Sequence, residues 1–311
     1  MFFKDPNHLI GVDIRAHDIL AVELAGTGKR CRLKRIGHMT LPSAVGEATV
    51  SDPVIIADTL SKLFTKGKFG TRNVSLSVSG FGVTVKNLPI KRVDPTLLHD
   101  RIMRIAEQYV PYPLASMYLD YMVFGNSTHQ PGQMDVLMVA APRSLVNAQV
   151  KAAKMADLVP VIVDVAPLSA VNCYTFSDDA PTSAVLLAVD ATSAAITIVD
   201  AGLLRFTRHV DMDFSGQPDA SELTRVLYET TDRLLESDLP QDVEKVYLYG
   251  SVPQLAILKN ELAREMDLDV ELLNPFGNIT VPSKLMTPEN QALIGPQSAI
   301  GVGLALRKGV S

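Results

Sequence analysis

The sequence contains no tryptophan, few aromatic residues of any kind, and only two cysteines among its 311 residues. Cys31 and Cys173 lie far apart in the chain, and no cluster of histidines accompanies either of them. Two isolated cysteines provide neither the framework of a small disulfide-rich protein nor the ligand set of a zinc site. The cysteine content therefore predicts a reduced, cytoplasmic protein.

The sequence also lacks long apolar runs and clusters of basic residues, which argues against a membrane-spanning protein and a nucleic-acid-binding protein. No uninterrupted apolar run reaches the roughly 20 residues that span a bilayer, and the first residues lead into a predicted strand rather than into the apolar core of a signal peptide. The basic residues are scattered along a chain whose formal net charge is -5, which argues against an electrostatic surface for nucleic acid. We therefore expect no direct membrane span and no nucleic-acid partner.

The chain does contain a repeated pattern, and at 47% hydrophobic residues it is long enough for two domains. Residues 9–14 (LIGVDI) and 186–191 (LLAVDA) are apolar runs that reach an aspartate, and each is followed by a polar break and a second apolar run. An alignment without gaps places Asp13 over Asp190, Arg15 over Thr192 and Val22 over Val199. Such a strand hairpin can present a carboxylate and backbone N–H groups to phosphate. The repeat predicts two similar halves that face one cleft.

The rest of the chain alternates between strand and helix patterns, which is typical of an α/β protein. Asp52-Pro53 and Asp94-Pro95 predict helix starts, because Asp caps free N–H groups and Pro suits the first helical turn. The first of these helices is expected to stop at Gly67, and the second to end before Pro111. Further helices are expected at 143–156, 166–174, 219–235, 253–266 and 297–307. Strands are expected at 9–25 and 31–41 as a meander, at 74–78, from the turn at 79–82 to about Asn87, and at 118–124, 135–141, 161–164, 184–189, 195–199, 204–210, 246–249 and 270–272.

Several short motifs occur in an order that resembles a known family. The repeated hairpin, the Gly250-Ser251 turn and the small-residue segment 299–305 resemble the actin-like ATPase superfamily. Within that superfamily the chain is similar, over almost its whole length, to the type IV pilus assembly protein PilM family, whose members are related to the cell-division protein FtsA. The motifs that carry this resemblance are Ser77-Val78-Ser79-Gly80, EQYVPYP at 107–113, LDY at 119–121, VAAP at 139–142 and LNPF at 273–276.

The resemblance implies an α/β, actin-like (ribonuclease H-like) fold of two domains with an inserted subdomain of the FtsA 1C type. Residues 1–82 and 159–180 would form the first actin-like domain, and residues 83–158 the inserted subdomain. Residues 181–311 would form the second actin-like domain, whose last helix packs back toward the cleft.

The same resemblance implies a cytoplasmic adapter rather than a metabolic enzyme. Family members hold the N-terminal cytoplasmic tail of the membrane protein PilN in a groove between the first and the inserted subdomain, and so dock peripherally at the inner membrane and contact the pilus assembly platform. Aromatic residues at a helix exit offer rigid contact area for such a partner, although they could equally cover the subdomain core. The segment from Ser77 to Val85 could add an edge for an extended peptide. The candidate groove residues are Val83, Val85, Tyr109, Pro111 and Tyr112.

The resemblance also implies ATP with a divalent ion in the cleft. The corresponding positions are Asp13, Arg15, Ala16, Asp190, Thr192, Ser193, Gly250 and Ser251, with Asp13 and Asp190 as candidate Mg²⁺ ligands through water. Relatives have glycine where this chain has Arg15 and Thr192, and glycine lets backbone N–H groups approach phosphate without a Cβ in the way. These departures favour weak or absent ATP binding. The alternative is retained binding in which Arg15 or Ser193 contacts phosphate instead.

Catalysis is not expected, and no catalytic residue is assigned. The family commonly carries Glu two residues after Asp164, where this chain has Ala166, and without it an attacking water has no residue to position it. An ATP-dependent small-molecule kinase or ATPase of the same superfamily is an alternative that needs intact phosphate glycines and a general base. An FtsA-like, membrane-associated filament protein is a second alternative. It would favour a C-terminal amphipathic helix, whereas the last helix here is expected to be buried.

Overall fold

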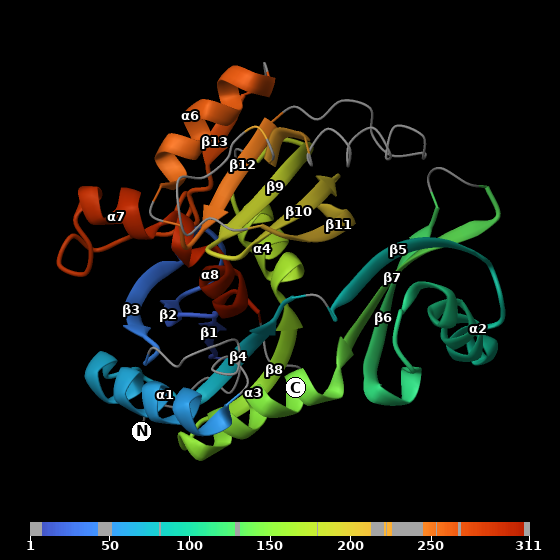
Figure 1. Cartoon of the computed structure of the whole chain (residues 1–311), viewed down its shortest axis with the longest axis horizontal. Coiled ribbons are helices and arrows are strands. Elements are labelled where there is room, and N and C mark those ends of the chain that lie inside the picture. The colour runs from blue at the N-terminus through green and yellow to red at the C-terminus, as the bar shows by residue number, and fades with distance from the viewer. Residues whose placement is uncertain are drawn as a thin grey trace.

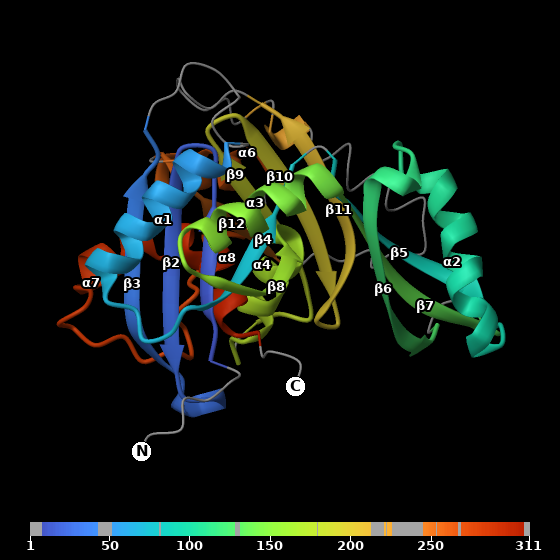
Figure 2. The same cartoon turned by 90° about the horizontal axis from the view of Figure 1, so that it is seen from below.

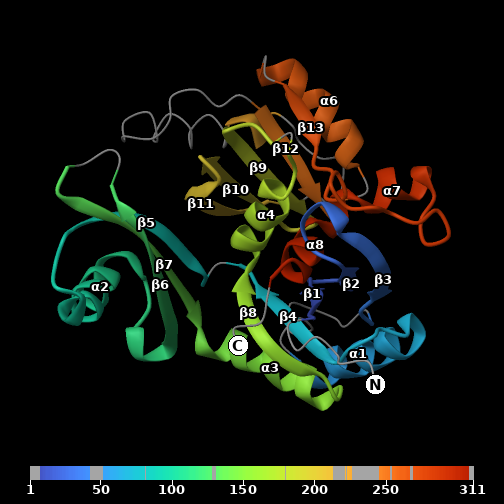
Figure 3. The ribbon, with the colours of Figure 1, turned by 180° about the vertical axis from the view of Figure 1, so that it is seen from behind.

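In the computed structural model, the strands of the described residues form three separate sheets (Figure 1). The third sheet stands on the opposite side of the molecule from helix α7 (Figures 1 and 3). The structure describes residues 8–42, 52–80, 82–127, 131–178, 180–212, 221, 223–225, 245–252, 254–266 and 269–307.

The first sheet has the order β3-β2-β1-β4-β8. Its strands are β1 (Ile10–Ile14), β2 (Asp18–Ala25), β3 (Arg32–Thr40), β4 (Asn73–Val78) and β8 (Val159–Val165). The first three strands are antiparallel, whereas β4 and β8 run parallel to β1. Helices α1 (Pro53–Gly67) and α3 (Arg143–Met155) lie along one face of this sheet (Figure 2) and enclose an apolar core with it.

The second sheet repeats this order as β11-β10-β9-β12-β13. Its strands are β9 (Ser183–Asp190), β10 (Ser193–Asp200), β11 (Leu203–Asp211), β12 (Lys245–Gly250) and β13 (Val270–Leu272), and helix α6 (Leu255–Met266) packs on it. Again the first three strands in the chain, β9, β10 and β11, pair antiparallel, whereas β12 and β13 run parallel to β9. The prediction of two similar halves from the repeated hairpin is therefore confirmed.

The two hairpins differ, however, in the length of their turns. Asp13 pairs with Leu20 and Asp190 pairs with Ser193, so six residues (14–19) separate the first pair and two (191–192) the second. The alignment without gaps is therefore wrong beyond the turn, and Val22 is not the counterpart of Val199. The first hairpin has room for a longer loop, which carries Arg15.

The third sheet has the order β5-β7-β6 and comes from the segment between β4 and β8. Its strands are β5 (Thr84–Lys91), β6 (Met117–Asn126) and β7 (Gln133–Pro142), and helix α2 (Pro95–Tyr109) packs over one face around a separate apolar cluster. β5 continues to Lys91 rather than ending near Asn87. An edge strand pairs on one side only, so it can include Pro89 without losing a bond to a second neighbour.

The predicted helix starts are confirmed. The Asp52 carboxylate accepts a hydrogen bond from the Val54 N–H at 2.8 Å, and the Asp94 carboxylate accepts one from the Thr96 N–H at 2.9 Å. Such caps satisfy N–H groups that the first helical turn leaves without partners. The predicted ends are also confirmed, because α1 ends at Gly67 and α2 ends at Tyr109.

The C-terminal part differs more from expectation. The predicted helix at 219–235 lies largely outside the described residues, whereas α7 (Pro288–Ile294) was not predicted. The hydroxyl of Thr287 caps α7 by accepting from the Asn290 N–H, and Thr287-Pro288 is a start signal that the sequence did contain. The last helix is shorter than predicted, since α8 spans Ala299–Ala305 after a 3₁₀ turn.

Helix α8 packs tightly between the first sheet and α4 (Ala166–Thr175). A Cβ placed on Gly11 of β1 would lie 2.0 Å from the Gly301 carbonyl oxygen, and one placed on Gly303 would lie 1.8 Å from the Ser169 carbonyl oxygen. Neither distance leaves room for a side chain. The small residues of the C-terminal segment therefore bring α8 against the strand that ends near Asp13.

Candidate cleft at the ends of the paired hairpins

A cavity of about 280 Å³ lies where the three sheets approach one another. The carboxyl ends of β1 and β9 open into it with Asp13 and Asp190, and the third sheet contributes the start of β5. The fold therefore brings together two aspartates that lie far apart in the chain. The described residues that line the cavity are Asp13, Arg15, Ser79, Gly80, Val83, Thr84, Val85, Lys86, Tyr109, Pro111, Ala166, Pro167, Ala188, Asp190, Ser193, Ala195, Thr207, His209, Tyr249 and Ile300.

Asp13 is buried near the end of β1. It accepts a hydrogen bond from the Ser77 hydroxyl of neighbouring β4 at 3.2 Å, and its other oxygen lies 3.7 Å from Nε of Arg15. Burial raises the pKa of the Asp13 carboxyl to about 6, and the negative charges of Asp190 and Asp18 act in the same direction. The Arg15 guanidinium and the Ser77 hydroxyl oppose this change. Part of the Asp13 population is therefore protonated near neutral pH.

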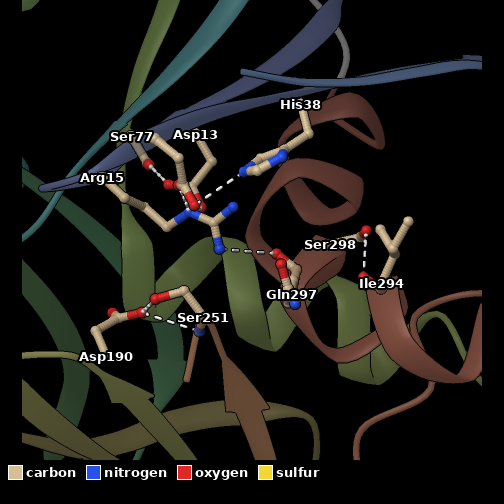
Figure 4. Close-up of polar contacts among 10 residues, drawn as sticks. Asp13, Arg15, His38, Ser77, Asp190, Ser251, Ile294, Gln297 and Ser298 are labelled. Carbon is tan, nitrogen blue, oxygen red and sulfur yellow. Dashed lines mark hydrogen bonds and ion pairs between the residues drawn. The ribbon is translucent and has the colours of Figure 1, made fainter. Parts of the chain in front are cut away.

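The Arg15 side chain turns inward instead of pointing to solvent (Figure 4). Its Nε lies 2.6 Å from Oδ1 of Asp18, and Nη1 donates to the Gln297 carbonyl oxygen at 3.5 Å. The second oxygen of Asp18 lies 3.0 Å from Nε2 of His38. With 9% of its side chain exposed, Arg15 links the first hairpin to the turn that precedes α8.

Asp190 is connected to the turn after β12. One carboxylate oxygen accepts hydrogen bonds from the Ser251 N–H at 3.1 Å and from the Ser251 hydroxyl at 2.7 Å (Figure 4). Gly250 has a φ of 134°, and a Cβ there would lie 2.1 Å from the Val189 carbonyl oxygen. Glycine is required at this turn, which brings Ser251 onto the second aspartate.

Predicted nucleotide positions and predicted groove residues, two separate sites in the expectation from the sequence, line this one cavity together. Asp13, Arg15, Asp190 and Ser193 line it together with Val83, Val85, Tyr109 and Pro111. The predicted positions that do not line it are Ala16, Thr192, Gly250, Ser251 and Tyr112.

The titratable side chains of Lys86, His209 and Tyr249 also line the cavity and were not among the predicted site residues. Burial lowers the pKa of His209, although Asp211 and Asp190 oppose this change, and burial raises the pKa of Tyr249. His209 reaches the cavity because β11 pairs with β10 in a register that places it opposite Ala195. Sequence patterns do not define that register, so no local signal marked His209.

The carboxylates that would hold Mg²⁺ beside a polyphosphate already interact with other protein groups. Among the described residues no group of three or more His, Cys, Asp or Glu side chains gathers in one place, so a Mg²⁺ ion here would need Asp13 and Asp190, with water and phosphate as its other ligands. The Arg15 guanidinium beside Asp13 would repel a cation, and one oxygen of Asp190 already accepts two hydrogen bonds from Ser251. Ala166 lines the cavity with a methyl group, at the position where the resemblance to the family implies a carboxylate.

A sequence model of the family described as type IV pilus assembly protein PilM matches residues 11–233. The chain belongs to this PilM family. The match begins in β1 and continues beyond β11, so it includes both hairpins and the whole third sheet. The motif-based resemblance is thereby confirmed.

Solved structures show which fold this PilM-family chain has. A PilM-PilN type IV pilus biogenesis complex is similar with a TM-score of 0.82 and 22% identity, covering 96% of this chain and 98% of the other. The ethanolamine utilization protein EutJ from Carboxydothermus hydrogenoformans has a TM-score of 0.54 and 12% identity, with coverage of 98% and 91%. A Bacteroides thetaiotaomicron protein with an actin-like ATPase fold has a TM-score of 0.52 and 10% identity, with coverage of 88% and 95%. The predicted actin-like α/β fold is confirmed.

Within the described ranges of this PilM-family chain, no helix is both long enough and apolar enough to cross a membrane.

The burial of Asp13 predicts a specific pH dependence of stability. Because its pKa is raised from 3.8 to about 6 in the folded protein, the folded state binds more protons than the unfolded state between these values. The resulting stabilisation is complete below about pH 4 and is lost as the pH rises through 6. Relative to Asp13→Asn, the wild type should lose up to about 3 kcal/mol of unfolding free energy between pH 4 and 7.

Urea unfolding of the wild type and of Asp13→Asn at a series of pH values measures the difference between their unfolding free energies. The Asn variant keeps the size of the side chain and cannot titrate, so other titrating groups cancel in the comparison. A difference between the two unfolding free energies that stays constant from pH 4 to 7 would contradict the assignment.

Proposed function

We propose that this chain is an adapter of type IV pilus assembly that holds the N-terminal cytoplasmic tail of a PilN-like membrane protein. Family membership and the similarity to a PilM-PilN complex support this proposal. The observation that carries it is the cavity, in which Val83, Val85, Tyr109 and Pro111 supply an apolar wall. A short tail that presents apolar side chains would bury them against this wall.

The position of β5 suits an extended peptide. β5 is an edge strand of the third sheet, where its one partner among the described strands is β7, and its first residues line the cavity. An edge strand offers unpaired N–H and C=O groups to a peptide, while alternate side chains of the peptide enter neighbouring pockets. We propose that the tail enters along Val83, Thr84 and Val85 and that Tyr109 and Pro111 of the α2 exit contact its side chains.

Tail capture would also determine where the protein works. A partner anchored in the inner membrane would keep the adapter on the cytoplasmic side, peripheral to the bilayer, and would connect it to components of the assembly platform.

The proposed division of the chain follows the three sheets. Residues 1–82 and 159–180 form a first actin-like domain, residues 83–158 an inserted subdomain, and residues 181–311 a second actin-like domain. The separate apolar cluster between α2 and the β5-β7-β6 sheet supports the inserted subdomain as a unit with its own core.

Calorimetric titration of the wild-type protein with a synthetic N-terminal tail peptide of the cognate PilN-like protein tests tail capture. A peptide of the same composition in scrambled order serves as control. We expect saturable binding of the peptide with the native sequence and no binding of the scrambled peptide. Absence of heat with both peptides, or equal affinity for both, would rule out capture.

We further propose that the cleft binds ATP and Mg²⁺ weakly or not at all. The inward Arg15 supports this proposal, because its guanidinium lies beside Asp13, where a metal-bound phosphate would approach. If the cleft held Mg²⁺, the carboxylates of Asp13 and Asp190 would have to coordinate it through water. Both carboxylates instead interact with Arg15 and Ser251.

Arg15→Gly should restore nucleotide binding in part. Glycine removes the guanidinium and lets the backbone approach a phosphate. With millimolar ATP and Mg²⁺, we expect a rise of a few degrees in Tm for the variant and no shift for the wild type in a thermal unfolding assay. Arg15→Lys keeps the positive charge and serves as control, with no shift expected. A clear ATP-dependent shift in the wild type would show that the cleft is intact.

A further inference from the structure

A second and larger cavity, of about 800 Å³, lies at the other end of β1. The cleft opens at Asp13, whereas this cavity begins at His8 and Leu9, just before β1. The described residues that line the two cavities do not overlap. The second cavity is lined by His8, Leu9, Leu24, Ala25, Gly26, Thr27, Gly28, Cys31, Lys34, Asn172, Thr175, Phe176, Ala305, Leu306 and Arg307.

Both charged residues of this lining, Lys34 and Arg307, are basic. None of the described lining residues is acidic, in a chain whose net charge is negative. Nζ of Lys34 lies 2.6 Å from the buried Glu23 carboxylate, and Nε and Nη2 of Arg307 lie 2.7 and 2.6 Å from Oδ2 of Asp164. An ammonium has three N–H donors and a guanidinium five, so both side chains retain donors for a further acceptor.

The cavity also contains a buried polar group without a partner. Nδ2 of Asn172, on α4, is inaccessible to solvent and has no hydrogen-bond partner among the described residues. A buried amide donor without a partner costs free energy that a bound acceptor would recover. Apolar wall is supplied beside these polar groups by Leu9, Leu24, Phe176 and Leu306.

We propose that this cavity binds a small amphipathic anion, a molecule with an apolar body and one carboxylate, sulfonate or phosphate group. Its volume lies within the range of small-molecule sites, which are mostly apolar with a few converging polar groups. The anionic group binds Lys34 and Arg307 and accepts from Asn172, while the body packs on the leucines and Phe176. The site is separate from the cleft, so it does not depend on tail capture.

Fluorescence titration with anilinonaphthalene sulfonate, an apolar ring system with one sulfonate, tests this proposal on the full chain. Phenylnaphthylamine has the same rings without the charge and is the matched control ligand. We expect the sulfonate to bind about tenfold more tightly than the neutral dye, as one charge-assisted contact would give. Lys34→Met should remove this advantage without weakening the neutral dye, whereas Lys62→Met, which removes the same charge from α1, should leave both affinities unchanged.

Two further variants establish that the dye occupies this cavity. Thr175→Trp places a large side chain at the cavity wall and should abolish binding of both dyes. Val159→Trp adds the same side chain on the exposed β8 position and should leave binding intact, and thermal unfolding of each variant confirms that it folds. Equal affinity of the two dyes for the wild type, or binding that survives Thr175→Trp, overturns the proposal.

Discussion

Gly303→Val is expected to leave little folded protein, because α8 and α4 approach each other at this glycine without room for a side chain. A Cβ at position 303 would lie 1.8 Å from the Ser169 carbonyl oxygen, which is backbone and cannot rotate away. Separating the two helices would disrupt the core that α8 shares with β1 and β2. We expect a loss of several kcal/mol of unfolding free energy, a large part of the 5–15 kcal/mol that is typical of a domain.

Soluble yield and thermal unfolding followed by circular dichroism measure this effect. Ile300→Val, on the same helix, removes one methyl group and should cost only about 1 kcal/mol. Gly11→Val should behave like Gly303→Val, because its Cβ would lie 2.0 Å from the Gly301 carbonyl oxygen. A Gly303→Val protein whose Tm lies within a few degrees of the wild-type value would show that the packing of α8 is different.

Tyr109→Ala is expected to weaken binding of the PilN-like tail peptide by about 30-fold. This figure corresponds to about 2 kcal/mol, the loss that defines a central aromatic contact in a binding site. Tyr109 lines the cavity at the exit of α2 while 44% of it remains exposed, so a peptide would cover it without displacing core packing. Calorimetric titration of the variant with the tail peptide gives the change in Kd.

Tyr112 provides the matched control. It is the same residue type, is 42% exposed and lies three residues further along the chain, yet it does not line the cavity. Tyr112→Ala should therefore change the Kd by less than about threefold, within the range of peripheral contacts. If Tyr112→Ala bound the peptide more weakly than Tyr109→Ala, the tail would not lie in the cavity.

Sequence patterns predicted the fold well where local chemistry determines it. Asp52-Pro53 and Asp94-Pro95 start helices because a short acceptor side chain and a fixed φ favour the first turn. The repeated apolar runs predicted two similar sheets, and the equivalence of their aspartates predicted that Asp13 and Asp190 face one cleft. These features depend on residues that are close in the chain or on a pattern that occurs twice.

Other features depend on tertiary contacts and were not predictable. The inward direction of Arg15 depends on Asp18, and on the Gln297 carbonyl group, which lies at the far end of the chain. The predicted nucleotide cleft and the predicted partner groove share one cavity because the third sheet places Val83 and Tyr109 beside the aspartates. Strand pairing brings His209 to the same cavity. Strand register and the packing of sheets against each other determine these positions, and neither leaves a local pattern in the sequence.

The central claim is that the cavity beside Asp13 and Asp190 receives the partner's tail. Hydrogen exchange followed by mass spectrometry, with and without the tail peptide, tests it most directly. We predict slower amide exchange in the peptide complex for Val83 to Lys86 and for the α2 exit around Tyr109, with no change from Leu24 to Lys34 at the second cavity. Unchanged exchange at Val83 to Lys86 under saturating peptide would contradict the claim.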